Sequence, residues 1–461
     1  MKNSLFPICC SLLAVVFSSG CKNNQLSPEI SRTGIHTQGS ANDNQSIEDY
    51  FKASFQGTPS LTINLSNNGT INLADVKKSS DSIWGIWSRT FSSQYGTLPS
   101  LQDQAATKMT VNSWNDLPAV GGGYPLNFYL MSKGDIPAQG YPLFISLHGS
   151  GERSAEFAAT LSWNKRFKDS PSAYFIPNIP TETRYRWYQV EKQYAYEKLI
   201  KQAYISGNAD PNKIYFTGIS EGGYGSQRLG AFYADYLAGA GPTAGGEPLE
   251  NAPPLNYRNI AFAFETGALD TGFGRNTNTQ LAKDKFDQLE AASPGEFVHQ
   301  INLQPGKTHG TVDYTIVTPW LVKHTRNPYP KHVSWVDFPM DGQYRKGFYN
   351  IAVDELPDVA NGSTYDRVIF DLIIDATNNK ITLDAKASNA AGTDTKAVTK
   401  GKITIFLNAQ LADLSKVVAV TYKGKEVFNA KITPNLSNLV RSCALFGDPT
   451  RLYPASITVN L

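Results

Sequence analysis

One segment of the sequence combines a nucleophile with the residues that a sharp turn requires. Lys213–Thr217 is a short apolar run typical of a strand; Gly218, Ser220 and Gly222 then form a G-x-S-x-G pattern, and Gly222–Leu237 is typical of a helix. A serine at a strand-to-helix turn is exposed on a strained backbone, where flanking glycines remove side chains that would collide. The helix that follows favours negative charge at its N-terminus. Ser220 is therefore the candidate nucleophile, although this pattern also arises by chance in a chain with 37 Gly.

The sequence offers few candidates for the base and the acid that would activate this serine. Of the six histidines, His309 lies in a loop directly after a predicted strand, where a structural turn histidine is the alternative. Asp270 lies in a loop after the preceding predicted strand, and a loop carboxylate can reach across to an imidazole. Glu265, at the end of that strand, is the other candidate acid, and Asp270 could instead merely cap a turn. The order Ser220, Asp270, His309 differs from the orders in chymotrypsin and subtilisin.

Residues from about 125 to 325 resemble the α/β-hydrolase superfamily. Four features fall in the order of that family. They are a glycine loop after an earlier strand, the turn at Ser220, the acid after a later strand and the histidine after the last strand. The closest group is that of secreted esterases and polyhydroxybutyrate depolymerases, with prolyl-oligopeptidase-like peptidases nearby. Glu221 stands where Ala, Tyr or Gln is more usual, which leaves the preference for an acyl group open.

The resemblance implies a mostly parallel α/β sheet with flanking helices and a Ser-His-Asp mechanism through an acyl-enzyme, without a metal or a cofactor. It also implies an oxyanion hole formed by the backbone N–H groups of Ser150 and Glu221. Ser150 belongs to the segment His148–Gly151, which directly follows the predicted strand Tyr141–Leu147; a plain glycine turn is the alternative. Trp187, in a loop after the third predicted strand, could line an acyl or sugar subsite, or could simply pack in that loop.

The N-terminus is typical of an export signal. A lysine precedes the apolar run Leu5–Phe17, which is too short to span a bilayer. The small residues Ser18–Gly20 then precede Cys21, which resembles a bacterial lipobox in which Cys21 is lipidated; an ordinary cleaved signal is the alternative. We expect a signal peptide over 1–20, a flexible tether over 21–46, and export to the bacterial cell envelope, with a lipid anchor at the outer membrane or cell surface.

The periodicity of apolar residues changes along the chain and predicts its organisation. Between residues 121 and 330, strand-like runs alternate with helical patterns, which predicts β-α-β units in an α/β-hydrolase catalytic domain. After residue 330 the helical patterns end, and short strand-like runs such as Val368–Ile374 predict a small all-β sandwich over 331–461. Residues 47–120, with a helical pattern over Leu73–Gln94, are expected to be an extension that packs on the catalytic domain.

Composition narrows the function further. The chain has 41% hydrophobic and 18% charged residues, enough for a large core, and its net charge of +2 gives no basic surface for nucleic acid. Three of the four cysteines lie in the first 21 residues, so no disulfide framework is expected around Cys443. Together with the predicted export signal and sandwich, the resemblance to α/β-hydrolases implies a serine esterase that removes acetyl or feruloyl groups from plant polysaccharide, or that cleaves small esters. The alternatives are a serine peptidase of the prolyl-oligopeptidase type and a non-catalytic surface protein that binds glycan.

Overall fold

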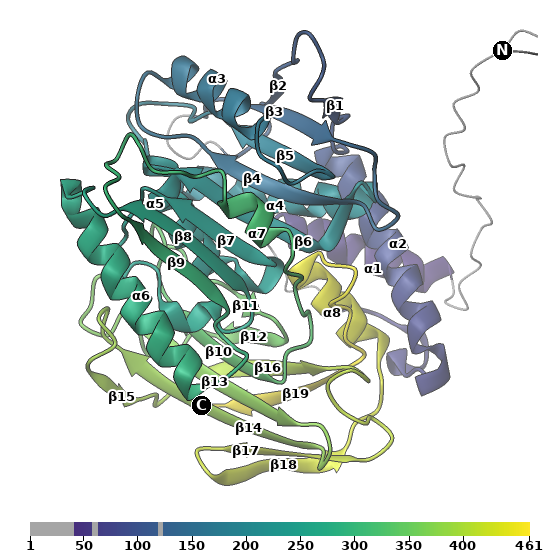
Figure 1. Cartoon of the computed structure of the whole chain (residues 1–461). Coiled ribbons are helices and arrows are strands. Elements are labelled where there is room, and N and C mark those ends of the chain that lie inside the picture. Colours follow the sequence, from purple (N-terminus) through teal and green to yellow (C-terminus); the bar gives the residue numbers. More distant parts are fainter. Residues whose placement is uncertain (1–40, 58–62, 119–122) are drawn as a thin grey trace, which may run out of the picture. The chain divides into compact units, whose positions relative to one another are not determined.

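The computed structural model describes residues 41–57, 63–118 and 123–461 (Figure 1). The predicted signal peptide 1–20 and the lipidation site Cys21 lie outside these residues, as does most of the predicted tether 21–46. The end of that tether is helical, because α1 spans Ala41–Phe55. Within the described ranges, no helix is both long and apolar enough to cross a membrane.

A nine-stranded sheet forms the centre of the predicted catalytic domain. Its strands are β1 Gln102–Asp103, β2 Asn112–Trp114, β3 Leu126–Lys133, β4 Tyr141–Leu147, β5 Ser172–Pro177, β6 Ala209–Ile219, β7 Gly239–Thr243, β8 Ala261–Gly267 and β9 His299–Gln304. The order is β1-β3-β5-β4-β6-β7-β8-β9, with β2 beside β3. All neighbours from β5 to β9 are parallel, and β3 is antiparallel to β5. This arrangement confirms the predicted mostly parallel α/β sheet with flanking helices.

Helices cover both faces of this sheet (Figure 1). They are α3 Arg153–Asn164, α4 Val190–Ser206, α5 Glu221–Phe232, α6 Arg275–Ala292 and α7 Val317–Leu321, with short 3₁₀ helices at Ala234–Tyr236, Pro254–Tyr257 and Gly272–Gly274. Successive side chains of a strand point to opposite faces. On β4, Leu143 and Ile145 belong to an apolar cluster that includes residues of α4, α5 and α6, whereas Phe144 belongs to a second cluster with residues of α3 and α7. The central strands are buried on both sides, which explains why they are continuous apolar runs.

The C-terminal region consists of two sheets, as predicted for a sandwich. One contains β10 His332–Asp337, β13 Arg367–Asp375, β14 Lys380–Ser388, β15 Thr395–Ala397, β17 Val417–Tyr422 and β18 Lys425–Lys431; the other contains β11 Gly347–Phe348, β12 Ile351–Glu355, β16 Lys402–Leu407 and β19 Ala455–Asn460. The buried rings of Trp335 on β10 and Phe348 on β11 stack with centroids 5.3 Å apart, which joins the apolar faces of the two sheets.

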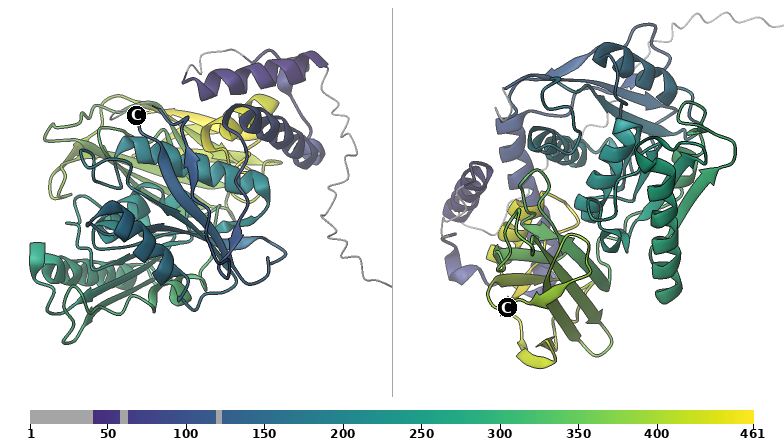
Figure 2. Two further views of the ribbon diagram at one scale, coloured as in Figure 1. Left: turned by 90° about the horizontal axis from the view of Figure 1, so that it is seen from above. Right: turned by 90° about the vertical axis from the view of Figure 1, so that its left-hand side faces the viewer.

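The expectation that no helix follows residue 330 is wrong. Helix α8, Leu436–Phe446, begins at Asn435, whose side chain accepts a hydrogen bond from the backbone N–H of Ser437, and ends at Gly447 in the left-handed conformation. It packs with α1 and with α2, Val76–Tyr95, in a separate apolar cluster that includes Trp87 and Cys443 (Figures 1 and 2). Short 3₁₀ helices at Ser66–Gly69 and Leu73–Asp75 precede α2. The apolar partner of the N-terminal helices is thus a helix from the other end of the chain.

Candidate active site

The loops that follow β6, β8 and β9 carry the three predicted catalytic side chains. Since the strands from β6 to β9 are all parallel, their carboxyl ends lie at one edge of the sheet. His309 Nε2 lies 3.0 Å from Ser220 Oγ, and His309 Nδ1 donates a hydrogen bond of 2.8 Å to Asp270 Oδ2. Asp270 can only accept at this contact when it is ionised, so Nδ1 carries the proton and Nε2 is free to accept the serine proton. The structure thus brings these three distant residues together.

The alternative acid, Glu265, has a different environment. It is buried, and its carboxylate accepts hydrogen bonds from the side-chain amides of Gln300, Asn302 and Gln304 on the neighbouring strand β9. Burial raises the pKa of Glu265, and the three amides oppose this effect. Glu265 therefore fixes β8 against β9, and the carboxylate that contacts His309 is that of Asp270.

The backbone at Ser220 has the strained geometry that presents a nucleophile. Ser220 has φ 56° and ψ −115°, values that a non-glycine residue rarely adopts. A Cβ on Gly222 would lie 2.0 Å from the carbonyl oxygen of Leu147, and one on Gly218 would lie 2.2 Å from the carbonyl oxygen of Gly222. Gly222 is needed because the turn passes so close to the end of β4, and Gly218 because the turn folds back on its own backbone. The Ser220 N–H donates to Thr243 O at 2.9 Å, which ties the turn to β7.

The two backbone groups predicted for an oxyanion hole lie at the same edge. Glu221 is the first residue of α5, so its N–H has no acceptor within the helix. The loop that contains Ser150 passes beside the nucleophile, since a Cβ on Gly149 would lie 3.5 Å from Ser220 Cβ. Ser150, Ser220 and Glu221 all line one cavity of about 760 Å³. The arrangement can therefore direct two N–H groups at a carbonyl oxygen on a substrate bound at Ser220.

His148 and Trp187 hold the glycine loop in place. His148 Nε2 accepts a hydrogen bond of 3.1 Å from Ile179 N–H, so Nδ1 carries the proton and donates to Gly149 O at 2.7 Å. Burial lowers the pKa of His148 to about 4, which keeps the ring neutral at pH 7. Trp187 is fully buried, and its Nε1 donates to His148 O at 2.9 Å. Trp187 does not line the cavity as predicted; its neighbour Tyr188 does.

An arginine that the sequence analysis did not identify contacts the acid. Arg275, the first residue of α6, donates from Nη1 to Asp270 Oδ1 at 3.0 Å, while Asp270 Oδ2 faces His309. Both carboxylate oxygens of Asp270 are thus hydrogen-bonded, which fixes the plane of the carboxylate. Arg275 follows Asp270 by only five residues, but nothing in that spacing shows that the side chain turns back towards the acid.

The wall of the cavity contains further charged side chains, which we call the cavity cluster: Arg186, Glu221, Arg228, Glu247 and Arg275. Burial raises the pKa of Glu221 to about 7, against the opposing effect of Arg186, with which Glu221 forms an ion pair. Burial also raises the pKa of Glu247, which lies 3.8 Å from Arg228. Arg228 in turn lies over the ring of Tyr188, 3.8 Å from its centroid. The cavity beside the nucleophile is therefore rich in polar groups.

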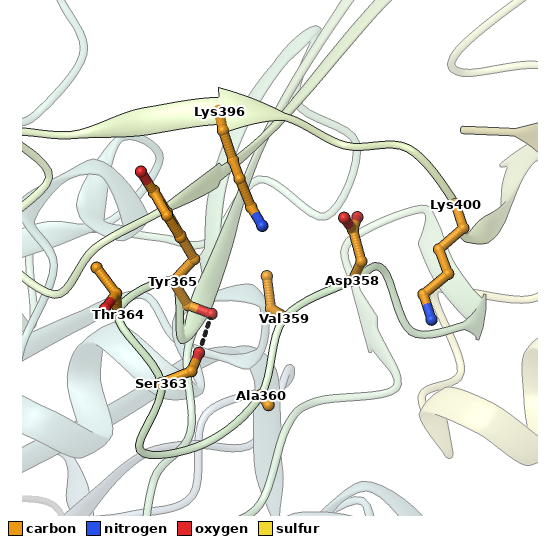
Figure 3. Close-up of a pocket in the computed structure, with 8 residues that line it drawn as sticks. All are labelled: Asp358, Val359, Ala360, Ser363, Thr364, Tyr365, Lys396 and Lys400. Carbon is orange, nitrogen blue, oxygen red and sulfur yellow. Dashed lines mark hydrogen bonds between the residues drawn. The ribbon is translucent and has the colours of Figure 1, made fainter.

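A second cavity, of about 570 Å³, lies on the C-terminal sandwich (Figure 3). Lys396 lies over the ring of Tyr365, with Nζ 4.7 Å from the centroid, and Ser363 donates to the Tyr365 carbonyl at 2.6 Å. The residues that line this cavity include no histidine, so Ser363 has no imidazole base there of the kind that His309 provides for Ser220. Across the described part of the chain, no group of three or more His, Cys, Asp or Glu side chains has an arrangement that could hold a metal ion.

No family model matches the sequence, and no curated protein matches it. Similar solved structures include a thermostable esterase, with 19% identity and a TM-score of 0.36 over 47% of this chain and 63% of that chain. A second is S-formylglutathione hydrolase from Staphylococcus aureus, with 15% identity and a TM-score of 0.35 over 47% of this chain and 98% of that chain. A third is the feruloyl esterase module from Clostridium thermocellum, with 16% identity and a TM-score of 0.34 over 50% of this chain and 90% of that chain. This chain thus spans less than two thirds of the thermostable esterase. Sequence identities and TM-scores this low say nothing about the reaction that this chain's own side chains could catalyse.

Proposed function

We propose that the protein is a serine esterase, with Ser220 as nucleophile, His309 as general base and acid, and Asp270 as the residue that orients His309. The observation that carries this proposal is the continuous chain of hydrogen bonds from Ser220 Oγ through His309 to Asp270. The positive φ of Ser220 supports it, since backbone strain of this kind is retained where a nucleophile must be presented.

In the proposed cycle, His309 Nε2 removes the Ser220 proton as Oγ attacks the carbonyl carbon of an ester. The backbone N–H groups of Ser150 and Glu221 stabilise the oxyanion, and His309 then protonates the leaving alcohol. Water, activated by the same imidazole, hydrolyses the acyl-enzyme and regenerates Ser220. Asp270 keeps the proton on Nδ1 and stabilises the imidazolium as it forms.

The proposed substrates are acetyl or feruloyl esters of plant polysaccharide, and the proposed location is the bacterial cell envelope, with Cys21 as lipid anchor. The export signal predicted from the sequence supports an extracellular substrate. A cavity of about 760 Å³ beside Ser220 is large enough for a sugar or an aromatic acyl group.

A substrate panel tests this proposal. The purified protein should hydrolyse p-nitrophenyl acetate and release acetate or ferulate from esterified polysaccharide, and should leave amino-acyl p-nitroanilides intact. Hydrolysis of the anilides with little activity on the esters would indicate a serine peptidase instead. Binding of the polysaccharide without hydrolysis of any ester would indicate a glycan-binding protein.

A further inference from the structure

The cavity beside Ser220 has polar groups for which the catalytic triad gives no reason. Three buried atoms of the cavity cluster, namely Glu221 Oε1, Arg228 Nε and Arg275 Nε, have no hydrogen-bond partner among the described residues. Glu221 and Arg275 are only 4% and 8% exposed, and all three residues line the same cavity. Buried polar atoms without partners are rare in proteins, and beside a nucleophile they indicate contacts with a ligand.

The charges of the cluster favour a neutral ligand. Each guanidinium already has a carboxylate beside it, since Arg186 pairs with Glu221 and Arg228 lies 3.8 Å from Glu247. Arg275 pairs with Asp270 at 3.0 Å. Above about pH 7, where Glu221 is ionised, an anionic ligand would be repelled by these carboxylates and a cationic ligand by the three arginines, so neither charge gains a net attraction.

The same atoms disfavour an apolar ligand. An alkyl or aryl group in the cavity would offer no hydrogen-bond partner to one acceptor, Glu221 Oε1, and two donors, Arg228 Nε and Arg275 Nε, so these buried atoms would stay unsatisfied. A hydroxyl group can both donate and accept, so vicinal hydroxyls can satisfy the acceptor and the donors together.

We propose that this cavity is a subsite for a neutral, hydroxyl-bearing part of the substrate, of the sugar class, adjacent to the ester bond. Its hydroxyls donate to Glu221 Oε1 and accept from Arg228 Nε and Arg275 Nε. The ring of Tyr188, 3.8 Å beneath the Arg228 guanidinium, holds that donor in place. This inference rests on the proposed esterase function and assigns the residues that recognise the substrate.

Two acetate esters test the subsite, because they share the acyl group and differ in the alcohol. A mono-O-acetylated methyl xyloside should have a kcat/KM at least about 10-fold above that of ethyl acetate, as expected for hydrogen bonds to charged groups. Arg228→Met, which keeps the length of the side chain and removes its donors, should reduce this ratio about 10-fold. Arg89→Met is the matched control, since Arg89 is exposed on α2, and it should leave the ratio unchanged.

A second measurement uses methyl xyloside without an ester, observed by ligand-detected NMR with the wild-type protein, so that it does not depend on folding of the variant. Binding that is displaced by the acetylated xyloside supports the subsite. Absence of binding, a wild-type ratio near one, or a ratio unaffected by Arg228→Met would overturn it. Failure of the wild type to hydrolyse either ester while methyl xyloside still binds would overturn the proposed esterase function and leave the subsite supported.

Discussion

Two groups of buried charges in this protein are organised in opposite ways. The first group is the cavity cluster beside Ser220. The second group, which we call the structural cluster, links residues 121–330 to the C-terminal region. It consists of Asp235, Arg326, Arg345, Asp448 and Arg451. In the structural cluster, each carboxylate lies between two guanidinium groups: Asp448 accepts from Arg326 and Arg451 at 2.8 Å each.

The two clusters shift the pKa of a buried carboxyl group in opposite directions, as Asp448 and Glu221 show. Burial alone would raise the pKa of Asp448, but Arg326 and Arg451 outweigh it and hold this pKa well below its usual range. Burial raises the pKa of Glu221 to about 7. Its ion-pair partner Arg186 is largely exposed, so its charge offsets the effect of burial on this pKa only in part. In the structural cluster two guanidinium groups compensate the burial of Asp448, whereas in the cavity cluster the burial of Glu221 is compensated only in part, in keeping with the proposed subsite.

The largest effect is expected at the acid that joins the cavity cluster to the triad. Asp270→Asn keeps the shape of the side chain but can donate to His309 Nδ1, which favours the wrong tautomer. We expect kcat on p-nitrophenyl acetate to fall about 10⁴-fold. The kinetics should be measured on variant protein whose circular dichroism matches that of the wild type. A loss smaller than tenfold would show that Asp270 does not orient the base.

A change in the structural cluster should affect stability instead. Asp448→Ala leaves Arg326 and Arg451 buried with one carboxylate fewer, and we expect the free energy of unfolding in urea to fall by about 3–5 kcal/mol. The matched control is Asp81→Ala, which removes an exposed ion pair with Lys77 on α2 and should cost less than about 1 kcal/mol. Equal effects of the two substitutions would contradict a stabilising role for the structural cluster.

The raised pKa of Glu221 predicts an effect of pH on stability. Between pH 4.5 and about 7 the folded protein keeps a proton that the unfolded chain has released, so the free energy of unfolding falls as pH rises through this window. Glu221→Gln removes this contribution, and its stability relative to the wild type should rise by up to about 3 kcal/mol between pH 4.5 and 8. Urea titrations across this range test it; parallel curves for the two proteins would rule it out.

The smallest effect is expected at Arg275, which acts through Asp270. Arg275→Gln removes the charge that fixes Asp270 Oδ1, and we expect kcat on ethyl acetate to fall about tenfold, in line with the loss of one hydrogen bond between charged groups. Arg275→Lys keeps the charge and should recover part of the loss, whereas a merely structural role would not distinguish lysine from glutamine. Identical kcat values for all three proteins would contradict a positioning role.

The fold and the positions of the three triad side chains could be predicted from the sequence because each depends on a local pattern. The strand, the glycines and the helix around Ser220 are contiguous. Asp270 follows β8, which is buried along its whole length, and His309 follows β9, the partly buried strand at the edge of the sheet. Helix α8 also has local signals, with Asn435 at its start and Gly447 at its end, yet it lies among strand-like runs and was not predicted.

The charge clusters could not be predicted, because their contacts are set by tertiary packing. Asp235 and Arg451 are separated by 216 residues along the chain. The same limit applies to Trp187: an aromatic residue in a loop near the site has the same local sequence whether it faces the cavity or packs beneath the loop, and here it donates to His148 O.

A serine esterase requires Ser220 to be an activated nucleophile, and covalent labelling measures this property directly. The protein is incubated with a fluorophosphonate and its mass is measured intact, alongside Ser220→Ala and with peptide mapping of the adduct. We predict one adduct, located on Ser220, and none on the variant. A wild-type protein that remains unmodified, or a Ser220→Ala variant that is labelled equally fast, would contradict the assignment of Ser220 as the nucleophile.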